Sequence, residues 1–213
     1  HQFRLDHQFS DDWSLQVGAS HRDTKLTGSS SDAEQARARQ KLYVDGHSLS
    51  RQRRSRRYDA EHSVLRAELA GAFETASLRH RVLIGGDFDH FRYDNFFTRY
   101  RPPAVSTNPD DQAGYVIDID NPVYGRYPLP ATAVLTNRLD TQRSFGFYVQ
   151  DQIELTDRLQ IRLGGRYDNL TLKVDNRLLA PAIRHNSRTY ERFSPQAGIV
   201  YDLNAAISLY AAY

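Results

Sequence analysis

The chain has 213 residues and a formal net charge of +2, and its mean hydropathy is −0.66. A charge this close to balance argues against general nucleic-acid binding. No apolar run approaches the roughly 18 residues that predict a transmembrane helix, which excludes a helical membrane protein.

The N-terminal segment predicts an antiparallel hairpin. Alternating residues from Phe3 to Phe9 precede the polar turn of Ser10 to Asp12, and the alternation resumes from Trp13 to Ala19. A period of two is the pattern of a strand with one apolar and one polar face. The order of a hydroxyl residue, an aspartate and alternating apolar residues recurs at Thr156 to Gly165.

A long connection is expected next, from Thr27 to Asp59. It contains an arginine-rich run whose members include Arg53, Arg54, Arg56 and Arg57. The run is typical of a solvated loop or strand end. Its functional alternative is contact with the anionic phosphates of lipopolysaccharide, for which bidentate arginine is suited.

A second hairpin joins Leu65–Phe73 to Val82–Phe88, and a loop is expected from Asn95 to Asn137. This loop is rich in aromatic residues, which stack on ligands while arginine or phenol groups meet ligand oxygens. Its other interpretation is a self-packed loop or an aromatic girdle at the membrane interface. The candidate ligand-binding residues are Phe96, Phe97, Tyr100, Arg101, Tyr124 and Tyr127.

The segment from Phe145 to Asp168 is the clearest hairpin. On its second arm Leu159, Ile161 and Leu163 fall on one face, and Gln160 and Arg162 fall on the other. Each arm keeps the alternation for roughly ten residues, the length of a strand that crosses a bilayer at a tilt.

A connection from Val174 to Thr189 and a fourth hairpin, from Phe193 to Tyr213, complete the pattern. The chain therefore predicts an all-β fold of about eight antiparallel strands. Short turns at one end and long loops at the other favour a segment of a transmembrane β-barrel, with periplasmic turns and extracellular loops. Because the chain starts and stops within alternating segments, we expect further strands to close the wall.

Motifs for catalysis and metal binding are not found in the sequence. It contains neither the spaced ligands of a zinc or calcium site nor a nucleophile elbow, a Walker loop or a dinucleotide-binding turn. We therefore expect no enzyme activity, no directly bound cofactor and no metal held by protein ligands.

Three motifs carry a resemblance to the central barrel of TonB-dependent siderophore receptors. They are Tyr148–Gln152, Gly164–Asp168 and Ser194–Gly198. The resemblance spans nearly the whole chain and implies a plugged, 22-stranded type of barrel. It also implies import of ferric siderophores across the bacterial outer membrane, with energy from the TonB complex. Residues 1–213 would then be part of the barrel domain, with the plug, the TonB-contacting segment and the other strands outside this chain.

Two alternatives remain open. The first is a passive porin or structural barrel without energy coupling. The second is a soluble β-sandwich binding module, which would have to bury the row of Gln160, Arg162, Arg166 and Asp168 against protein at a high cost.

Overall fold

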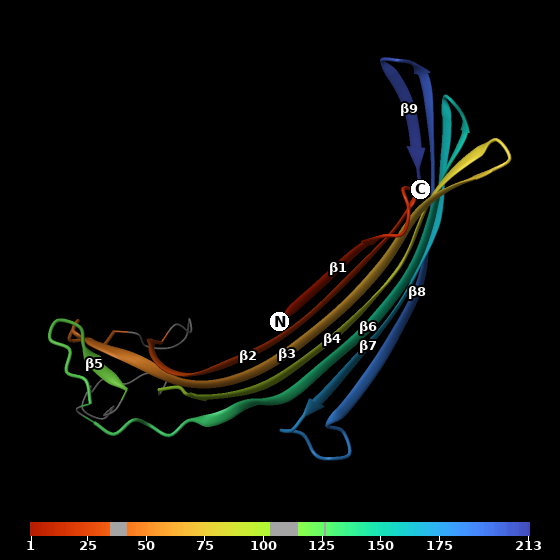
Figure 1. Ribbon diagram of the computed structural model, residues 1–213. Coiled ribbons are helices and arrows are strands. Elements are labelled where there is room, and N and C mark those ends of the chain that lie inside the picture. The colour runs from red at the N-terminus through yellow and green to blue at the C-terminus, as the bar shows by residue number, and fades with distance from the viewer. Residues whose placement is uncertain (35–41, 103–114, 126) are drawn as a thin grey trace.

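The strands form a single curved β-layer, which we call the wall (Figure 1). The structure, a computed structural model, describes residues 1–34, 42–102, 115–125 and 127–213. Within these ranges no helix is long and apolar enough to cross a membrane. The nine strands are β1 (Gln2–Gln8), β2 (Trp13–Ala33), β3 (Ser48–Thr75), β4 (Leu78–Tyr100), β5 (Val116–Asp118), β6 (Ala133–Thr156), β7 (Leu159–Asn176), β8 (His185–Asn204) and β9 (Ile207–Ala212).

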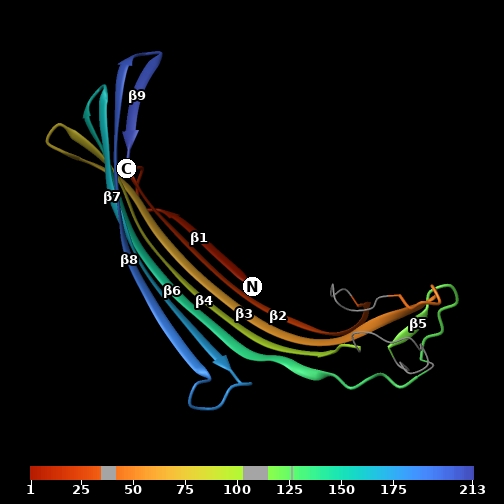
Figure 2. The same cartoon turned by 180° about the vertical axis from the view of Figure 1, so that it is seen from behind.

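Eight of these strands form a meander of four hairpins, which confirms the predicted antiparallel topology. Their order is β1-β2-β3-β4-β6-β7-β8-β9, and every neighbouring pair is antiparallel. The tight turns gather at one end and the long connections at the other, in both views (Figures 1 and 2). The short strand β5 was not predicted, and it pairs with Ser48–Ser50 at the end of β3 far from the tight turns.

The strand register defines two faces of the wall, because directly opposed residues in neighbouring strands lie on the same face. One face carries Arg66, Asp87, Gly146 and Asp168 in a single row, and we call it the polar face. The opposite, apolar face carries Leu159, Ile161 and Leu163, as predicted. Phe147 is 54% exposed and Leu163 is 49% exposed on this face, so the apolar side chains have no second layer above them among the described residues.

The apolar face changes character along one line across the sheet. Ala19, Leu65, Phe88 and Phe145 oppose one another on β2, β3, β4 and β6, and we call them the boundary row. The next row away from the tight turns consists of His21, Ser63, His90 and Arg143. The segment of β4 below the boundary, from Leu78 to Phe88, matches the roughly 9 to 11 residues that a tilted strand needs to cross a bilayer.

The strands continue well beyond the boundary row, so the expected loop limits were wrong. β2 reaches Ala33, β3 starts at Ser48, and β4 ends only at Tyr100. β7 also extends to Asn176, and β8 starts at His185. Beyond the apolar band charged and aromatic residues occur on both faces of a strand, so backbone pairing persists there without the regular apolar–polar alternation that reveals it in sequence.

Candidate functional site

The polar face holds a paired cluster at the level of the apolar band. The Tyr148 hydroxyl donates to the Glu68 carboxylate, and Arg66 donates to the same carboxylate at 2.6 Å. These three residues come from β3 and β6, separated by β4, which contributes Gly85 between Glu68 and Tyr148. A Cβ at Gly85 would lie 2.4 Å from the Tyr148 ring, so glycine allows the phenol to reach across β4.

Arg166 is the second arginine of this cluster. Its guanidinium donates to Asp168 at 2.8 Å and to Asp87 at 2.9 Å, and lies over the Tyr148 ring at 5.3 Å from the centroid. It passes over Gly146, where a Cβ would lie 1.9 Å from Nη2. Gly85 and Gly146 therefore have a shared role, because each lets a side chain of the ion-paired network, Tyr148 or Arg166, lie directly over the backbone.

The arginine-rich run lies within β3, above the boundary row, and its members alternate between faces. Arg54 and Arg56 share the polar face, since they oppose Ser30 and Gly28 of β2, in register with Arg66. Arg53 and Arg57 share the apolar face. The four residues that were predicted as one lipopolysaccharide patch are thus divided between the two faces by the period of the strand.

Aromatic side chains follow the polar face below these arginines. Phe97 opposes Arg56, whose guanidinium is 5.6 Å from the ring centroid. Tyr58 and Tyr93 lie 5.7 Å apart between ring centroids, and Phe91 continues the ladder 6.2 Å from Tyr93. The sequence analysis named Phe97 as a candidate but did not predict this ladder, although Phe91, Tyr93 and Phe97 keep the period of two that a strand requires.

The six predicted ligand-binding residues do not form one cluster. Phe96, Phe97 and Tyr100 belong to β4 and not to a loop. Phe97 is on the polar face, whereas Phe96 lies beneath Arg57 on the apolar face, 5.2 Å from its guanidinium. Tyr124 is 77% exposed on the connection after β5, and Tyr127 is half-buried on the same connection.

Tyr100 and Arg101 belong to a packed region at the end of the wall that is far from the tight turns. Tyr100 contacts Tyr115, with 5.4 Å between ring centroids, and Tyr115 is buried. Arg101 lies 3.4 Å from the fully buried carboxylate of Glu34. Gln52 is buried here too. These contacts tie the ends of β2, β3 and β4 together, which is a structural role for two of the six candidates.

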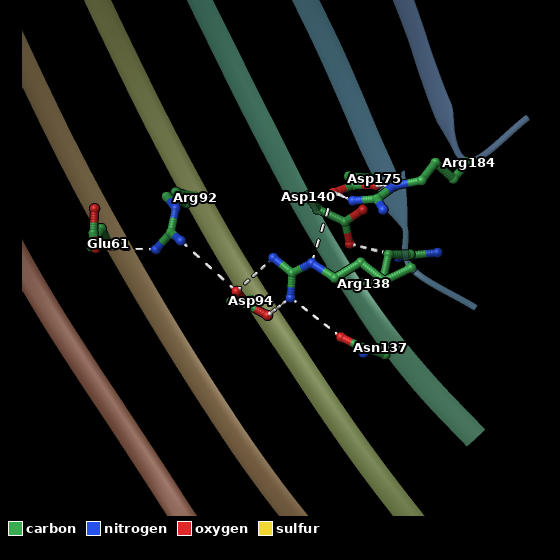
Figure 3. Close-up of polar contacts among 9 residues, drawn as sticks. Glu61, Arg92, Asp94, Asn137, Arg138, Asp140, Asp175 and Arg184 are labelled. Atoms are coloured by element: carbon green, nitrogen blue, oxygen red, sulfur yellow. Dashed lines mark hydrogen bonds and ion pairs between the residues drawn. The ribbon is translucent and has the colours of Figure 1, made fainter. Parts of the chain in front are cut away.

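A ladder of ion pairs crosses the apolar face above the boundary row. Arg92 connects Glu61 to Asp94, and Figure 3 shows Arg92 between these two carboxylates. Arg177 then donates to both oxygens of Asp94 at 2.9 Å, and Arg184 pairs with Asp175. The Arg177 guanidinium holds the pKa of Asp94 below its usual value. The ladder fastens the β7–β8 connection to β4.

None of the residues that the structure describes form a group of three or more histidine, cysteine, aspartate or glutamate side chains suited to a metal ion. The polar face carries cationic and aromatic side chains above the boundary row, such as Arg56 and Phe97.

The chain belongs to a known receptor family. The sequence profile described as TonB dependent receptor-like, beta-barrel matches residues 1–213. The metal-pseudopaline receptor CntO of Pseudomonas aeruginosa is 29% identical over 213 residues, which cover 99% of this chain and 28% of the relative. The ferrioxamine receptor of Yersinia enterocolitica is 29% identical over 218 residues, with the same coverage of 99% and 28%. The chain thus spans about a quarter of the length of these relatives.

Solved structures share the fold at lower identity. The siderophore receptor PiuA from Acinetobacter baumannii superposes with a TM-score of 0.65 at 17% identity, covering 99% of this chain and 31% of PiuA. The unliganded ferric citrate transporter FecA superposes with a TM-score of 0.68 at 13% identity, covering 99% of this chain and 26% of FecA. The wall is therefore a segment of this type of barrel.

Family membership places the chain in the outer membrane and orients its two faces. Members are receptors and transporters rather than enzymes. In an outer-membrane barrel the apolar face meets lipid, the polar face lines the interior, and the tight turns are periplasmic. The arginines and aromatic residues above the boundary row are then at the extracellular mouth.

Proposed function

We propose that this chain forms part of the barrel wall of a receptor that imports ferric siderophores across the outer membrane with energy from the TonB complex. The observation that carries the proposal is that the ion pairing of arginines differs between the membrane level and the mouth of the polar face. At the level of the membrane Arg66 and Arg166 are paired with carboxylates, whereas Arg56, at the mouth, has no ion pair among the described residues. A mouth with cationic and aromatic groups suits a wrapped iron complex, because the chelator supplies the iron ligands itself.

The receptors named among the relatives support the proposed cargo. They include receptors for metal-pseudopaline and for ferrioxamine. The coupling to TonB is proposed from the family alone, since none of the described residues bears on it. A passive porin or structural barrel, the competing hypothesis, predicts that ligand crosses without energy.

The test is uptake of radiolabelled iron by cells that carry the full-length receptor as their sole siderophore receptor. We expect saturable uptake that disappears when TonB is deleted while surface binding persists. A panel of catecholate, hydroxamate and carboxylate complexes covers the chelator classes. Uptake that is unaffected by TonB deletion would support the passive barrel, and failure to bind any complex would contradict the receptor proposal.

We also propose that the outer side of the wall contacts lipopolysaccharide, at a lower level than the sequence indicated. His90 and Arg143 lie on the apolar face in the row immediately above the boundary row, and Lys173 lies one row higher on the same face. None of the three has an ion pair among the residues described. Arg53 and Arg57 lie on the same face but further from the lipid. Lipid phosphates gather where the apolar band ends, so cations at that level meet them first.

A further inference from the structure

The arginines of the arginine-rich run are divided between the two faces of β3, and this division indicates the charge of the metal complex that is imported. We propose that the polar-face arginines Arg54 and Arg56 select a metal chelate with net negative charge, and we call them the mouth arginines. This inference rests on the proposed import function and deepens it, because it distinguishes anionic from neutral complexes.

Like charges are placed together at this point of the wall. Arg54 directly opposes Arg99 of β4 on the polar face, and Arg56 is the next residue of β3 on that face. Directly opposed cross-strand residues have Cβ atoms about 4.5 to 5.5 Å apart, and like charges in this arrangement destabilise the sheet. Asp32 offsets part of this charge, with a carboxylate oxygen 3.7 Å from Arg54. An anionic ligand at the mouth would meet Arg54 and Arg56 on the same face of β3.

The mouth arginines are held against the wall. The Nε atoms of Arg54 and Arg56 are buried without a hydrogen-bond partner among the described residues, and the Nε of Arg54 lies 3.7 Å from a carboxylate oxygen of Asp32. The side chain of Arg54 is 26% exposed, so its guanidinium is neither fully enclosed nor free in water. Donors held in this way bind oxyanions better than donors on a mobile chain, because less side-chain entropy is lost on binding.

Stacking alone does not account for the mouth arginines. Arg56 lies over Phe97 on the polar face, and Arg57 lies over Phe96 on the apolar face, at similar distances of 5.6 and 5.2 Å. Structural stacking is therefore satisfied on either side of β3. Only the polar-face member points to the interior, where the cargo passes. The two pairs form a matched comparison between an arginine that faces the cargo and one that does not.

The experiment uses the full-length receptor in cells and two ferric complexes of similar size. Three catecholate dianions around iron(III) leave a negative complex, whereas three hydroxamate anions leave a neutral one. The variants are Arg54→Gln, Arg56→Gln and Arg56→Lys, with Arg53→Gln and Arg57→Gln as controls from the other face. Binding is measured in the cold, uptake at growth temperature, and surface expression with an antibody.

We expect the wild type to prefer the anionic complex, and each mouth-arginine glutamine variant to lose about tenfold in affinity for it, as for a hydrogen bond to a charged group. Arg56→Lys should retain most of the affinity, and the controls should change it less than twofold. Wild-type affinity for the anionic complex should also fall as salt is raised. That salt measurement needs no variant, so it holds even if a variant fails to reach the surface.

TonB-dependent uptake of the neutral complex with no preference for the anionic one would overturn this inference and leave the import function intact. Equal losses in Arg56→Gln and Arg57→Gln, at equal expression, would also overturn it, because the effect would then be structural. Absence of binding and uptake for both complexes would contradict the import proposal itself.

Discussion

Replacing Gly146 with alanine should release Arg166 from its ion pairs. The new Cβ would lie 1.9 Å from Nη2 of Arg166 and 2.5 Å from its Cζ, so the two cannot coexist. The obstructing group is the end of a flexible side chain, which will swing away rather than strain the backbone. Arg166 then loses its contacts with Asp87 and Asp168, at 2.9 and 2.8 Å.

The magnitude follows from these two contacts. Hydrogen bonds to charged groups contribute about 1.5 to 3 kcal/mol each when buried. Arg166 and Asp87 are each 32% exposed and Asp168 is 43% exposed, so solvent screening reduces each contact to about 0.5 to 1 kcal/mol. The expected loss is about 1 to 2 kcal/mol. A glycine-to-alanine change also reduces the entropy of the unfolded chain, which stabilises by about 0.4 to 1 kcal/mol.

Gly18 provides the matched control. It lies on the polar face in the same row, two strands away from Asp87, and a Cβ there would meet nothing within 4 Å. Gly18→Ala should therefore be neutral or slightly stabilising. The free energy of unfolding of the full-length receptor would be measured in detergent micelles by urea titration. We expect Gly146→Ala to be about 1 to 2 kcal/mol less stable than Gly18→Ala.

A double-mutant cycle decides the cause. In an Arg166→Ala background the side chain that the Cβ displaces is already gone, so Gly146→Ala should cost no more than Gly18→Ala. A cost that persists in that background would show that a group other than Arg166, such as Asp87 with its Oδ2 2.9 Å from the new Cβ, resists the methyl group. Equal stability of the two alanine variants with Arg166 present would refute the reasoning altogether.

Two further predictions concern the extracellular side. His47 contacts Asp120 across the connection that contains β5, and this hydrogen bond, followed by the Asp120 charge, raises the pKa of His47 above its ordinary 6.5. Because the folded-state pKa is the higher one, the contact stabilises the connection below pH of about 6.5 and weakens as pH rises through the raised value. Asp120→Asn should lower the pKa of His47 toward the ordinary value. The pKa is measured by NMR of a receptor with labelled histidine rings, and an unchanged titration would show that the pair does not form. On the apolar face, Arg143→Gln and Lys173→Gln should each weaken binding of bisphosphorylated lipid A to the purified receptor by about fivefold, the effect of one cation near an anionic surface. Arg188→Gln, at the level of Lys173 but on the polar face, is the control, and an equal loss there would contradict the proposed lipid contact.

The sequence was sufficient to predict the part of each strand that crosses the membrane. Alternation at Leu159, Ile161 and Leu163 predicted both the strand and the face, because lipid on one side and the interior on the other impose a period of two. The tight turns within the hairpins also carried clear sequence signals. The family resemblance rested on the same segments, since Gly164–Asp168 and Tyr148–Gln152 belong to the wall.

The candidate site was less predictable for a physical reason. Beyond the boundary row no face meets lipid, so Arg53 to Arg57 and Asn95 to Tyr100 show no alternation of apolar and polar residues, although they are strands. Their composition was visible, but their division between two faces was not. Adjacent arginines looked like one patch in sequence, whereas pleating sends them to opposite sides.

The sequence by itself determined the antiparallel hairpins, the apolar band and the end of the wall that carries the tight turns, because these depend on local period and turn chemistry. Only the tertiary structure decided which residues meet across strands. Arg166 reaches Asp87 over Gly146, and Arg177 reaches Asp94 from the β7–β8 connection. Such contacts depend on strand register over some 80 residues of chain, and a one-residue slip would send every side chain to the other face.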